Sequence, residues 1–479
     1  MITINNYISN QLARASSRLK EYIQDEQGNA YPQRSVYEEL EKYLKSFLDR
    51  SSIEDRWIII PGLRGVGKTT VLAQLFLNYR SKIGEQEMLY ISLDEVVNLC
   101  GSSVQEALEV YEDILGTSFE KLTKPVFIFF DEIQYDPKWA GILKSVFDRS
   151  KKVFMICTGS SAVALQTNPD VARRATFFKM FPVSFSEFLL IREGRSCDEK
   201  LQKKIKEILF SSGSATEVYN KLKQYEKEVL SFWSVVDRQY IDKYLRTGTL
   251  PFAIKKESET KVYQAINLLL DKVINQDVLS LGKFDVKTLG CIKRIMSLIT
   301  DSEIVSIQTL ASILEISANT VADVLGVLEC AELLIRILPY GGNAKKVKKP
   351  SRYQFMSSAM RSMFLSVAGS EQVSASQKGK LMEDIVAMTL YKEFIAYSNI
   401  QNSLNYDNAE GGADFILTLA NKNVIPIELG IGEKKWVQVK KTMNKVKASK
   451  YGMVIHNGPL ALVEEENIVK VPLEYFLLI

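Results

Sequence analysis

The sequence predicts an α/β protein with a parallel sheet near the N-terminus, helices in the middle and a mixed α/β domain at the C-terminus. Three observations support this fold class. Four short apolar segments between residues 57 and 157 alternate with helical segments, as in a parallel sheet covered by helices. Residues 196–285 have mostly helical periodicity, charged on one side and apolar on the other. An amphipathic helix over residues 378–394 precedes two short strands within residues 412–430.

The composition is that of a globular protein with several domains. The chain has 479 residues, 46% hydrophobic and 25% charged, so about three or four domains are expected. Because the net charge is only +4, nucleic-acid binding would have to depend on local basic clusters. Five scattered cysteines and a single histidine, His456, argue against zinc and histidine-based metal sites. Without an apolar leader or a run of about 18 apolar residues, we expect a cytoplasmic protein with no membrane span.

The segment RWIIIPGLRGVGKTT has the pattern of a phosphate-binding loop between a strand and a helix. Glycines allow backbone N–H groups to approach a phosphate, and the helix N-terminus adds partial positive charge. Lys68 would reach the β- and γ-phosphates, and the Thr69 hydroxyl would bind Mg²⁺. The sequence therefore predicts an ATP and Mg²⁺ site whose contact residues here are Gly62, Arg64, Gly65, Val66, Gly67, Lys68, Thr69 and Thr70.

A pair of acids ends a second buried strand. The apolar residues Val126–Phe130 are followed by Asp131 and Glu132. We expect Asp131 to bind Mg²⁺ together with Thr69, and Glu132 to polarise the attacking water. The alternative is that the two acids only form the solvated end of a strand. Another apolar segment lies between the two motifs in the chain, which predicts that another strand separates the two motif strands in the sheet.

Two further features complete the predicted nucleotide site. An apolar segment, Val153–Cys157, leads into TGSS, where a hydroxyl would lie beside the γ-phosphate, and we include Ser160 in the site. Arg173 and Arg174 then precede another expected strand. An arginine at this place can act on the γ-phosphate of a neighbouring subunit in a homo-oligomer, and the alternative is a surface pair on a loop.

The segments GLRGVGKTT, FFDEIQ, TGSS and FPVSFSEFL resemble, in this order, prokaryotic AAA-superfamily (P-loop) ATPases with a winged helix and a C-terminal restriction-endonuclease-like, PD-(D/E)XK domain. The resemblance implies that Arg174 matches the arginine of the family's AGR segment, with Arg173 replacing its glycine. Glu132, Lys68 and Arg174 are thus the candidate catalytic residues. The expected domains are a P-loop ATPase domain with an N-terminal helical segment (1–195), a helical lid (196–285), a winged-helix domain (286–368) and a restriction-endonuclease-like domain (369–479).

Residues 303–355 have the pattern of a winged helix. Two helices are expected, the second with Ser317 as its N-cap, and an alternating segment with a Gly-Gly-Asn turn follows. Five cations within eight residues would neutralise several phosphates of DNA, although winged helices also serve as protein–protein modules. The residues expected to contact nucleic acid are Lys345, Lys346, Lys348, Lys349 and Arg352.

Three acids match the acidic positions of the restriction-endonuclease-like core. Glu383 lies on the amphipathic helix, and Asp414 and Glu428 lie in the two strands. The resemblance implies that they bind Mg²⁺. However, Gly430 occupies the position of the lysine expected two residues after Glu428, so only Lys434 or Lys435, folding back, would replace it. Two alternatives follow: an inactive nuclease fold that serves as a binding or assembly surface, or a nuclease with a relocated lysine or a slow rate.

The sequence supports one leading hypothesis and two alternatives for function. In the first, Mg²⁺-dependent ATP binding and hydrolysis repositions the winged-helix and C-terminal domains on DNA. In the second, a signalling or scaffold ATPase holds a protein partner, such as a component of prokaryotic defence or toxin control, through its C-terminal domain. In the third, the chain is an ATP-dependent DNA nuclease.

Overall fold

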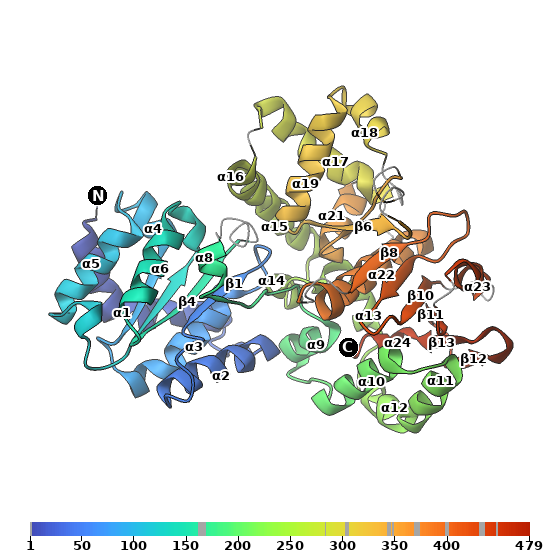
Figure 1. Cartoon of the computed structure of the whole chain (residues 1–479), viewed down its shortest axis with the longest axis horizontal. Helices are drawn as coiled ribbons and strands as arrows, with labels where there is room; N and C mark the ends of the chain where they lie inside the picture. Colours follow the sequence, from blue (N-terminus) through green and yellow to red (C-terminus); the bar gives the residue numbers. More distant parts are fainter. Residues whose placement is uncertain are drawn as a thin grey trace. The chain divides into compact units, whose positions relative to one another are not determined.

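The computed structural model describes residues 2–160, 169–282, 284–301, 306–342, 346, 349–367, 374–397, 402–430, 436–446 and 449–479. The chain divides into two compact units, Met1–Phe181 and Pro182–Ile479 (Figure 1).

The N-terminal unit contains a parallel five-stranded sheet in the order β2-β3-β4-β1-β5. The prediction that one strand separates the loop strand from the acid strand is confirmed, and that strand is β4. The segment between the two motifs in the chain, β2, lies instead at the edge beyond β3. The strands are β1 (Trp57–Pro61), β2 (Met88–Ser92), β3 (Val126–Asp131), β4 (Val153–Gly159) and β5 (Thr176–Phe177).

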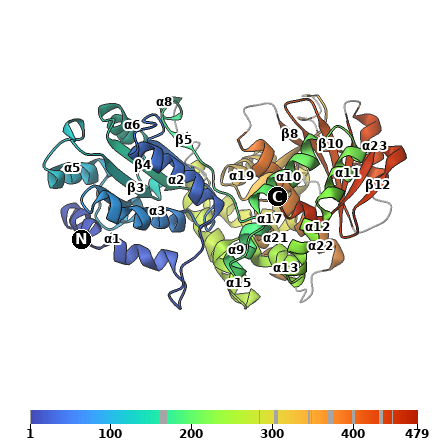
Figure 2. The same cartoon turned by 90° about the horizontal axis from the view of Figure 1, so that it is seen from below.

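Helices cover both faces of this sheet (Figures 1 and 2). On one face, alternate strand residues form a core with apolar residues of α4, α5 and α6. On the other face, the Phe47 ring of α2 lies 5.5 Å from that of Phe127, and the Phe76 ring of α3 lies 5.4 Å from that of Phe129. The helical elements are α1 (Ile4–Ile23), α2 (Ser35–Leu48), α3 (Lys68–Ile83), α4 (Leu93–Asn98), α5 (Val104–Leu115), η1 (Phe119–Lys121), η2 (Ile133–Tyr135), α6 (Trp139–Arg149) and α8 (Pro169–Ala172).

The C-terminal unit begins with helices, as the periodicity of residues 196–285 predicts. Two π-helical turns, η3 and η4, interrupt the series. Whether these helices act as a lid stays a prediction. The elements are α9 (Phe185–Glu193), α10 (Glu199–Ser211), α11 (Ala215–Gln224), α12 (Glu226–Ser234), α13 (Gln239–Lys243), η3 (Tyr244–Gly248), α14 (Pro251–Ile254), α15 (Glu259–Lys272), η4 (Val273–Val278) and α16 (Leu279–Leu281).

Three helices and an antiparallel hairpin follow. These are α17 (Val286–Asp301), α18 (Ile307–Leu314), α19 (Ala318–Cys330), β6 (Leu334–Pro339) and β7 (Arg352–Phe355). Ser317 caps α19, as predicted, since its hydroxyl accepts a hydrogen bond from the Thr320 N–H at 3.0 Å. The predicted turn residue Asn343 lies outside the described residues.

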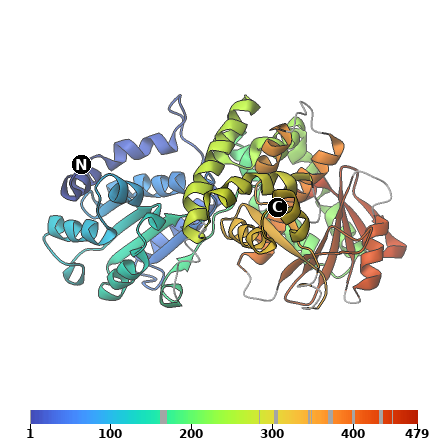
Figure 3. The ribbon, with the colours of Figure 1, turned by 90° about the horizontal axis from the view of Figure 1, so that it is seen from above.

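The hairpin continues into a mixed sheet with the order β12-β13-β11-β10-β9-β8-β6-β7 (Figure 3). The two strands predicted within residues 412–430 are β9 and β10, which pair antiparallel as a hairpin with Lys422 at a φ of 65° in its turn. The predicted amphipathic helix is α22. The elements are α21 (Ser358–Val367), α22 (Ala375–Leu390), η5 (Tyr391–Ile395), β8 (Ser403–Tyr406), β9 (Phe415–Thr418), β10 (Val424–Leu429), α23 (Trp436–Lys445), β11 (Gly452–His456), β12 (Ala461–Val463), η6 (Glu464–Glu466), β13 (Ile468–Pro472) and α24 (Leu473–Phe476).

Within the described ranges, no single helix is long and apolar enough to cross a membrane. Only the pair α18 and α19, bent by 110° at the break, passes the same criteria of length and composition.

Candidate functional site

The predicted phosphate-binding loop lies between β1 and α3, at the carboxyl end of the sheet. Gly65 and Gly67 have φ angles of 83° and 94°, a left-handed backbone that strongly favours glycine. Gly62 is required for a different reason, because a Cβ there would lie 2.3 Å from the carbonyl oxygen of Met180. Helix α3 starts at Lys68, so its N-terminal N–H groups and partial positive charge lie next to the turn. This geometry suits an anionic ligand.

The Lys68 side chain is buried inside this loop. Only 5% of the residue is exposed, and its ammonium donates hydrogen bonds to the carbonyl oxygens of Gly62 at 2.7 Å and Leu63 at 3.0 Å. The loop therefore holds a positive charge at its centre. Arg64, Val66 and Thr70 belong to the same loop and helix start, as predicted.

Asp131, at the end of β3, is held by three hydroxyl groups from three other elements. Thr69 Oγ1 lies 3.0 Å and Tyr90 Oη 2.9 Å from Asp131 Oδ2, and the Thr158 hydroxyl donates to Oδ1. Burial raises the pKa of Asp131, as does the neighbouring charge of Glu132, while the three hydrogen bonds oppose this shift. The structure thus brings the predicted Mg²⁺ ligands together, and their hard oxygen donors suit that ion.

Glu132 follows with an unusual backbone conformation, φ 54° and ψ 50°. The left-handed region costs a non-glycine residue about 1–3 kcal/mol, so surrounding contacts must maintain it. Its Oε2 lies 3.5 Å from Arg64 Nη2 and accepts a hydrogen bond from the Gln134 amide. The other end of that amide, Gln134 Oε1, accepts from the Ser160 N–H at 3.2 Å. Glu132 is therefore connected to both the phosphate-binding loop and the end of β4.

The Ser160 hydroxyl is a buried polar group of this site that lacks a hydrogen-bond partner among the described residues. The residue is 3% exposed, and its Oγ has no hydrogen-bond partner within the part of the chain that the structure describes. A buried hydroxyl without a partner is destabilising by roughly 1–3 kcal/mol. This observation fits a polar ligand group at the end of β4. Its neighbour Ser161 lies outside the described residues.

Arg174 makes contacts within its own chain. Its Nε donates to Asp148 Oδ1 at 2.7 Å, on α6, and its Nη1 donates to the carbonyl oxygen of Asp170 at 2.9 Å. Arg173 is exposed. The action of Arg174 on a neighbouring subunit stays a prediction.

A second group of acids lies in the C-terminal unit. Glu383 of α22, Asp414 before β9 and Glu428 of β10, here called the C-terminal carboxylate cluster, are brought together as predicted. Asp414 N–H donates to Glu428 Oε2 at 3.1 Å, and Leu429 N–H donates to Asp414 Oδ2 at 2.9 Å. Burial and the charge of Asp414 raise the pKa of Glu383 to about 7.

Metal binding by these three acids stays a prediction. Among the described residues, no group of three or more His, Cys, Asp and Glu side chains is placed to hold a metal ion. A cation of the chain itself lies in this cluster, since Arg352 Nη1 is 3.2 Å from Asp414 Oδ1 and 3.9 Å from Glu383 Oε2. Gly430 follows β10, and Lys434 and Lys435 lie outside the described residues.

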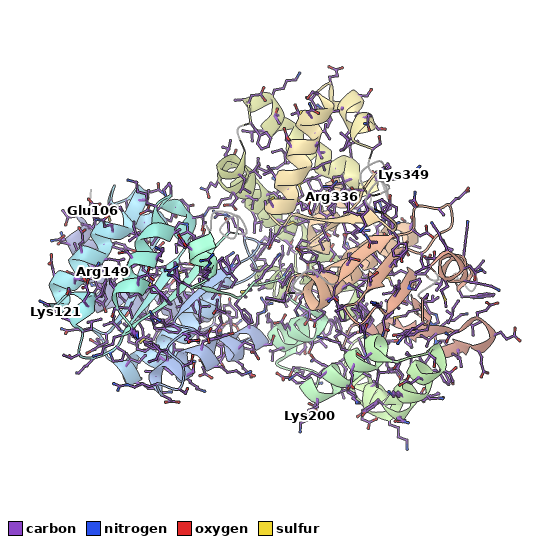
Figure 4. All side chains as sticks on the ribbon, viewed as in Figure 1. Glu106, Lys121, Arg149, Lys200, Arg336 and Lys349 are labelled. Carbon is purple, nitrogen blue, oxygen red and sulfur yellow. The ribbon has the colours of Figure 1, made fainter. Side chains whose placement is uncertain are left out.

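The residues predicted to contact nucleic acid differ in their exposure to solvent. Arg352 is 6% exposed and faces the carboxylate cluster, so its assignment to the exposed basic segment was wrong. Lys349 is exposed, as is Arg336 on β6, and Figure 4 labels both. Lys346 is partly buried, and the predicted contacts Lys345 and Lys348 lie outside the described residues.

Several residues of both sites were missed by the sequence interpretation. Tyr90 and Gln134 contact the acid pair, and only the position of Gln134, two residues after Glu132, could have indicated its role. In the C-terminal unit, Arg361 pairs with the fully buried Asp384 at 2.6 Å. Asp384 directly follows Glu383 in the chain, but no sequence pattern indicated its partner.

Comparisons with known proteins give two family models, two relatives and solved structures to which this chain is similar. Residues 54–189 match the family model of an AAA domain, and residues 238–371 match a domain of unknown function, DUF8612. The chain is 33% identical over 481 residues to the uncharacterized protein MJ1637 of Methanocaldococcus jannaschii, covering 100% of this chain and 95% of that protein. It is 21% identical to MJ1544 of the same organism, covering 81% and 77%. Among solved structures, the Walker-type ATPase PABY2304 of Pyrococcus abyssi is 14% identical with a TM-score of 0.39, covering 72% of this chain and 97% of that one.

Proposed function

This chain belongs to the family of the uncharacterized protein MJ1637 of Methanocaldococcus jannaschii, and we propose that it is an AAA-type ATPase that binds ATP with Mg²⁺ and hydrolyses it. The observation that carries this proposal is the hydrogen bond between Thr69 Oγ1 and Asp131 at 3.0 Å, beside the buried ammonium of Lys68. A lysine inside a glycine loop and a hydroxyl–carboxylate pair are the groups that a Mg²⁺–triphosphate requires.

In this proposal each residue has a defined task. Lys68 and the N–H groups at the start of α3 bind the β- and γ-phosphates, and Thr69 with Asp131 would hold Mg²⁺. The bound ion would neutralise charge on the transferring phosphoryl group. Ser160, whose buried Oγ has no partner among the described residues, would donate to the γ-phosphate.

Glu132 would orient and polarise the attacking water. Its carboxylate is shared between Arg64 and Gln134, and Gln134 in turn contacts the backbone of Ser160. A change at the γ-phosphate position is therefore coupled through two side-chain contacts to the orientation of Glu132. This connection supports a nucleotide-dependent switch rather than a passive nucleotide store.

Lys68→Ala tests nucleotide binding directly. We expect ATP affinity, measured by calorimetry with Mg²⁺, to fall by about 10- to 100-fold, because charged hydrogen bonds contribute about 1.5–3 kcal/mol each. Lys121→Ala is the matched control, since Lys121 is an exposed lysine of the same unit (Figure 4). Unchanged affinity in Lys68→Ala, or no ATP binding by the wild type, would exclude this site.

We also propose that the C-terminal unit contacts DNA. The order α17-α18-α19-β6-β7, three helices followed by an antiparallel hairpin, supports a winged helix here. Exposed Arg336 and Lys349, with Lys346 between them in the chain, support a basic surface at the hairpin. Such a surface would bind the phosphate backbone without sequence preference and with strong salt dependence.

A double variant, Lys346→Ala with Lys349→Ala, tests the DNA proposal. We expect the slope of the logarithm of DNA affinity against the logarithm of salt concentration to become shallower by about 2, one for each lost phosphate contact. Lys200→Ala, an exposed lysine on α10, is the control (Figure 4). An unchanged slope would refute the assigned surface.

A scaffold ATPase that holds a protein partner is the second candidate. It is favoured by the arginine inside the carboxylate cluster, which speaks against metal-dependent cleavage by the third candidate, an ATP-dependent nuclease. Rates of ATP hydrolysis with and without duplex DNA, repeated at rising salt, separate the first two. Hydrolysis stimulated by DNA supports the DNA-associated switch, and slow hydrolysis indifferent to DNA supports the scaffold.

A further inference from the structure

The C-terminal carboxylate cluster contains a positive charge that comes from outside its own three segments. Arg352 begins β7, a strand of the hairpin, and its side chain is 7% exposed. Its Nη1 lies 3.2 Å from both Asp414 Oδ1 and the Asp414 carbonyl oxygen, and 3.9 Å from Glu383 Oε2. The guanidinium is therefore seated between two of the three carboxylates.

The second arginine of this region, Arg361, pairs directly with a different carboxylate. Arg361 donates to both oxygens of Asp384, at 2.6 and 2.8 Å, and to Gln354 Oε1 at 2.9 Å. Gln354 in turn donates to Glu383 Oε2 at 3.0 Å. Arg361 is thus matched by a carboxylate of its own, and Arg352 is the cation that contacts Asp414 and Glu383.

The remaining contacts hold the carboxylates near one another. Asp414 Oδ2 accepts from the Leu429 N–H, and Glu428 Oε2 accepts from the Asp414 N–H. These bonds involve the backbone N–H groups of Asp414, just before β9, and Leu429, in β10, so they would persist if Arg352 were shortened. Three acids would then share a largely buried position without the guanidinium, and like charges at short range favour uptake of a cation.

We propose that Arg352 is a built-in counter-ion that keeps divalent cations out of the C-terminal carboxylate cluster. Arg352 and a divalent metal cannot occupy this position at the same time, because both are cations that need the same oxygens of Asp414 and Glu383. The cluster is closed to Mg²⁺ and Mn²⁺ while Arg352 is in place, and it becomes a hard-cation site when that charge is removed. This inference does not depend on ATP binding by the other unit.

Mn²⁺ binding to the nucleotide-free full-length chain tests this inference, with free Mn²⁺ followed by electron paramagnetic resonance. Wild type and Asp414→Asn are expected to give the same isotherm, because the cluster takes no metal. Arg352→Met is expected to gain one Mn²⁺ per chain that is absent from the wild-type isotherm at the same Mn²⁺ concentrations. Adding Asp414→Asn to Arg352→Met is expected to abolish the gained ion.

Two control variants are measured in the same way. Arg352→Lys keeps the charge and is expected to gain no ion, and Arg336→Met, on the neighbouring strand, is expected to behave as wild type. Binding of Mn²⁺ to the wild type that is lost in Asp414→Asn would overturn the proposal, even if Arg352→Met fails to fold. A folded Arg352→Met protein that gains no ion would overturn it as well.

Discussion

Replacing Glu132 with glutamine is expected to lower the rate of ATP hydrolysis by about 10²- to 10⁴-fold, the usual contribution of a positioned general base. Glutamine keeps the shape and the ability to accept a hydrogen bond from Gln134, so the loop geometry and ATP affinity should stay within a few-fold of wild type. Only the capacity to polarise water is lost. The variant should therefore retain bound ATP.

Steady-state phosphate release, measured alongside ATP binding by calorimetry, checks this result. Glu109→Gln, on the exposed side of α5, is the matched control and should hydrolyse ATP at the wild-type rate. Equal turnover by wild type and Glu132→Gln would remove Glu132 from the mechanism. A loss of ATP binding in Glu132→Gln would instead show that Glu132 maintains the structure of the nucleotide site.

Replacing Asp384 with asparagine is expected to destabilise the C-terminal unit by about 3–5 kcal/mol, the typical effect of breaking a buried ion pair. Asp384 is 0% exposed and Arg361 2%, with two hydrogen bonds of 2.6 and 2.8 Å between them. Asp384 also accepts from the Phe355 N–H of β7 at 2.8 Å. Without the carboxylate charge, the guanidinium of Arg361 stays buried and uncompensated, which is the main cause of the loss.

Urea unfolding followed by far-UV circular dichroism measures this change. Asp148→Asn, which breaks the half-exposed pair with Arg174 in the other unit, is the control, and we expect it to lower the free energy of unfolding by no more than about 1 kcal/mol. A comparably small loss in Asp384→Asn would show that the Asp384–Arg361 pair contributes little.

The nucleotide site was largely predictable because its groups are close in sequence and chemically distinctive. A glycine-rich turn before a helix specifies Lys68 and Thr69, and an apolar strand ending in two acids specifies Asp131 and Glu132. Tyr90 was not predictable, because a tyrosine in an apolar strand indicates burial and not which residue its hydroxyl contacts. That contact depends on the parallel pairing of β2 with β3, where Ser92 lies opposite Asp131.

The contacts of the C-terminal carboxylate cluster were less predictable than those of the nucleotide site. The resemblance to a restriction-endonuclease-like core placed Glu383, Asp414 and Glu428 in one expected cluster, while the sequence pattern grouped Arg352 with the neighbouring lysines as a DNA contact. Residues an odd number of positions apart on a strand point to opposite faces, so local composition does not assign each cation to a surface. In the structure Arg352 is buried and forms an internal ion pair with Asp414.

By itself the sequence determined the four apolar strands and the glycine turn of the nucleotide site, the acid pair Asp131 and Glu132, and the helical periodicity that follows, since these depend on periodicity and short-range spacing. Tertiary structure alone decided the strand order, with β4 and not β2 between β1 and β3. It also decided which charges meet: Arg64 with Glu132, Arg361 with Asp384 and Arg352 with Asp414. Electrostatic pairing depends on distances of a few ångströms between segments far apart in the chain, and only the folded packing sets those distances.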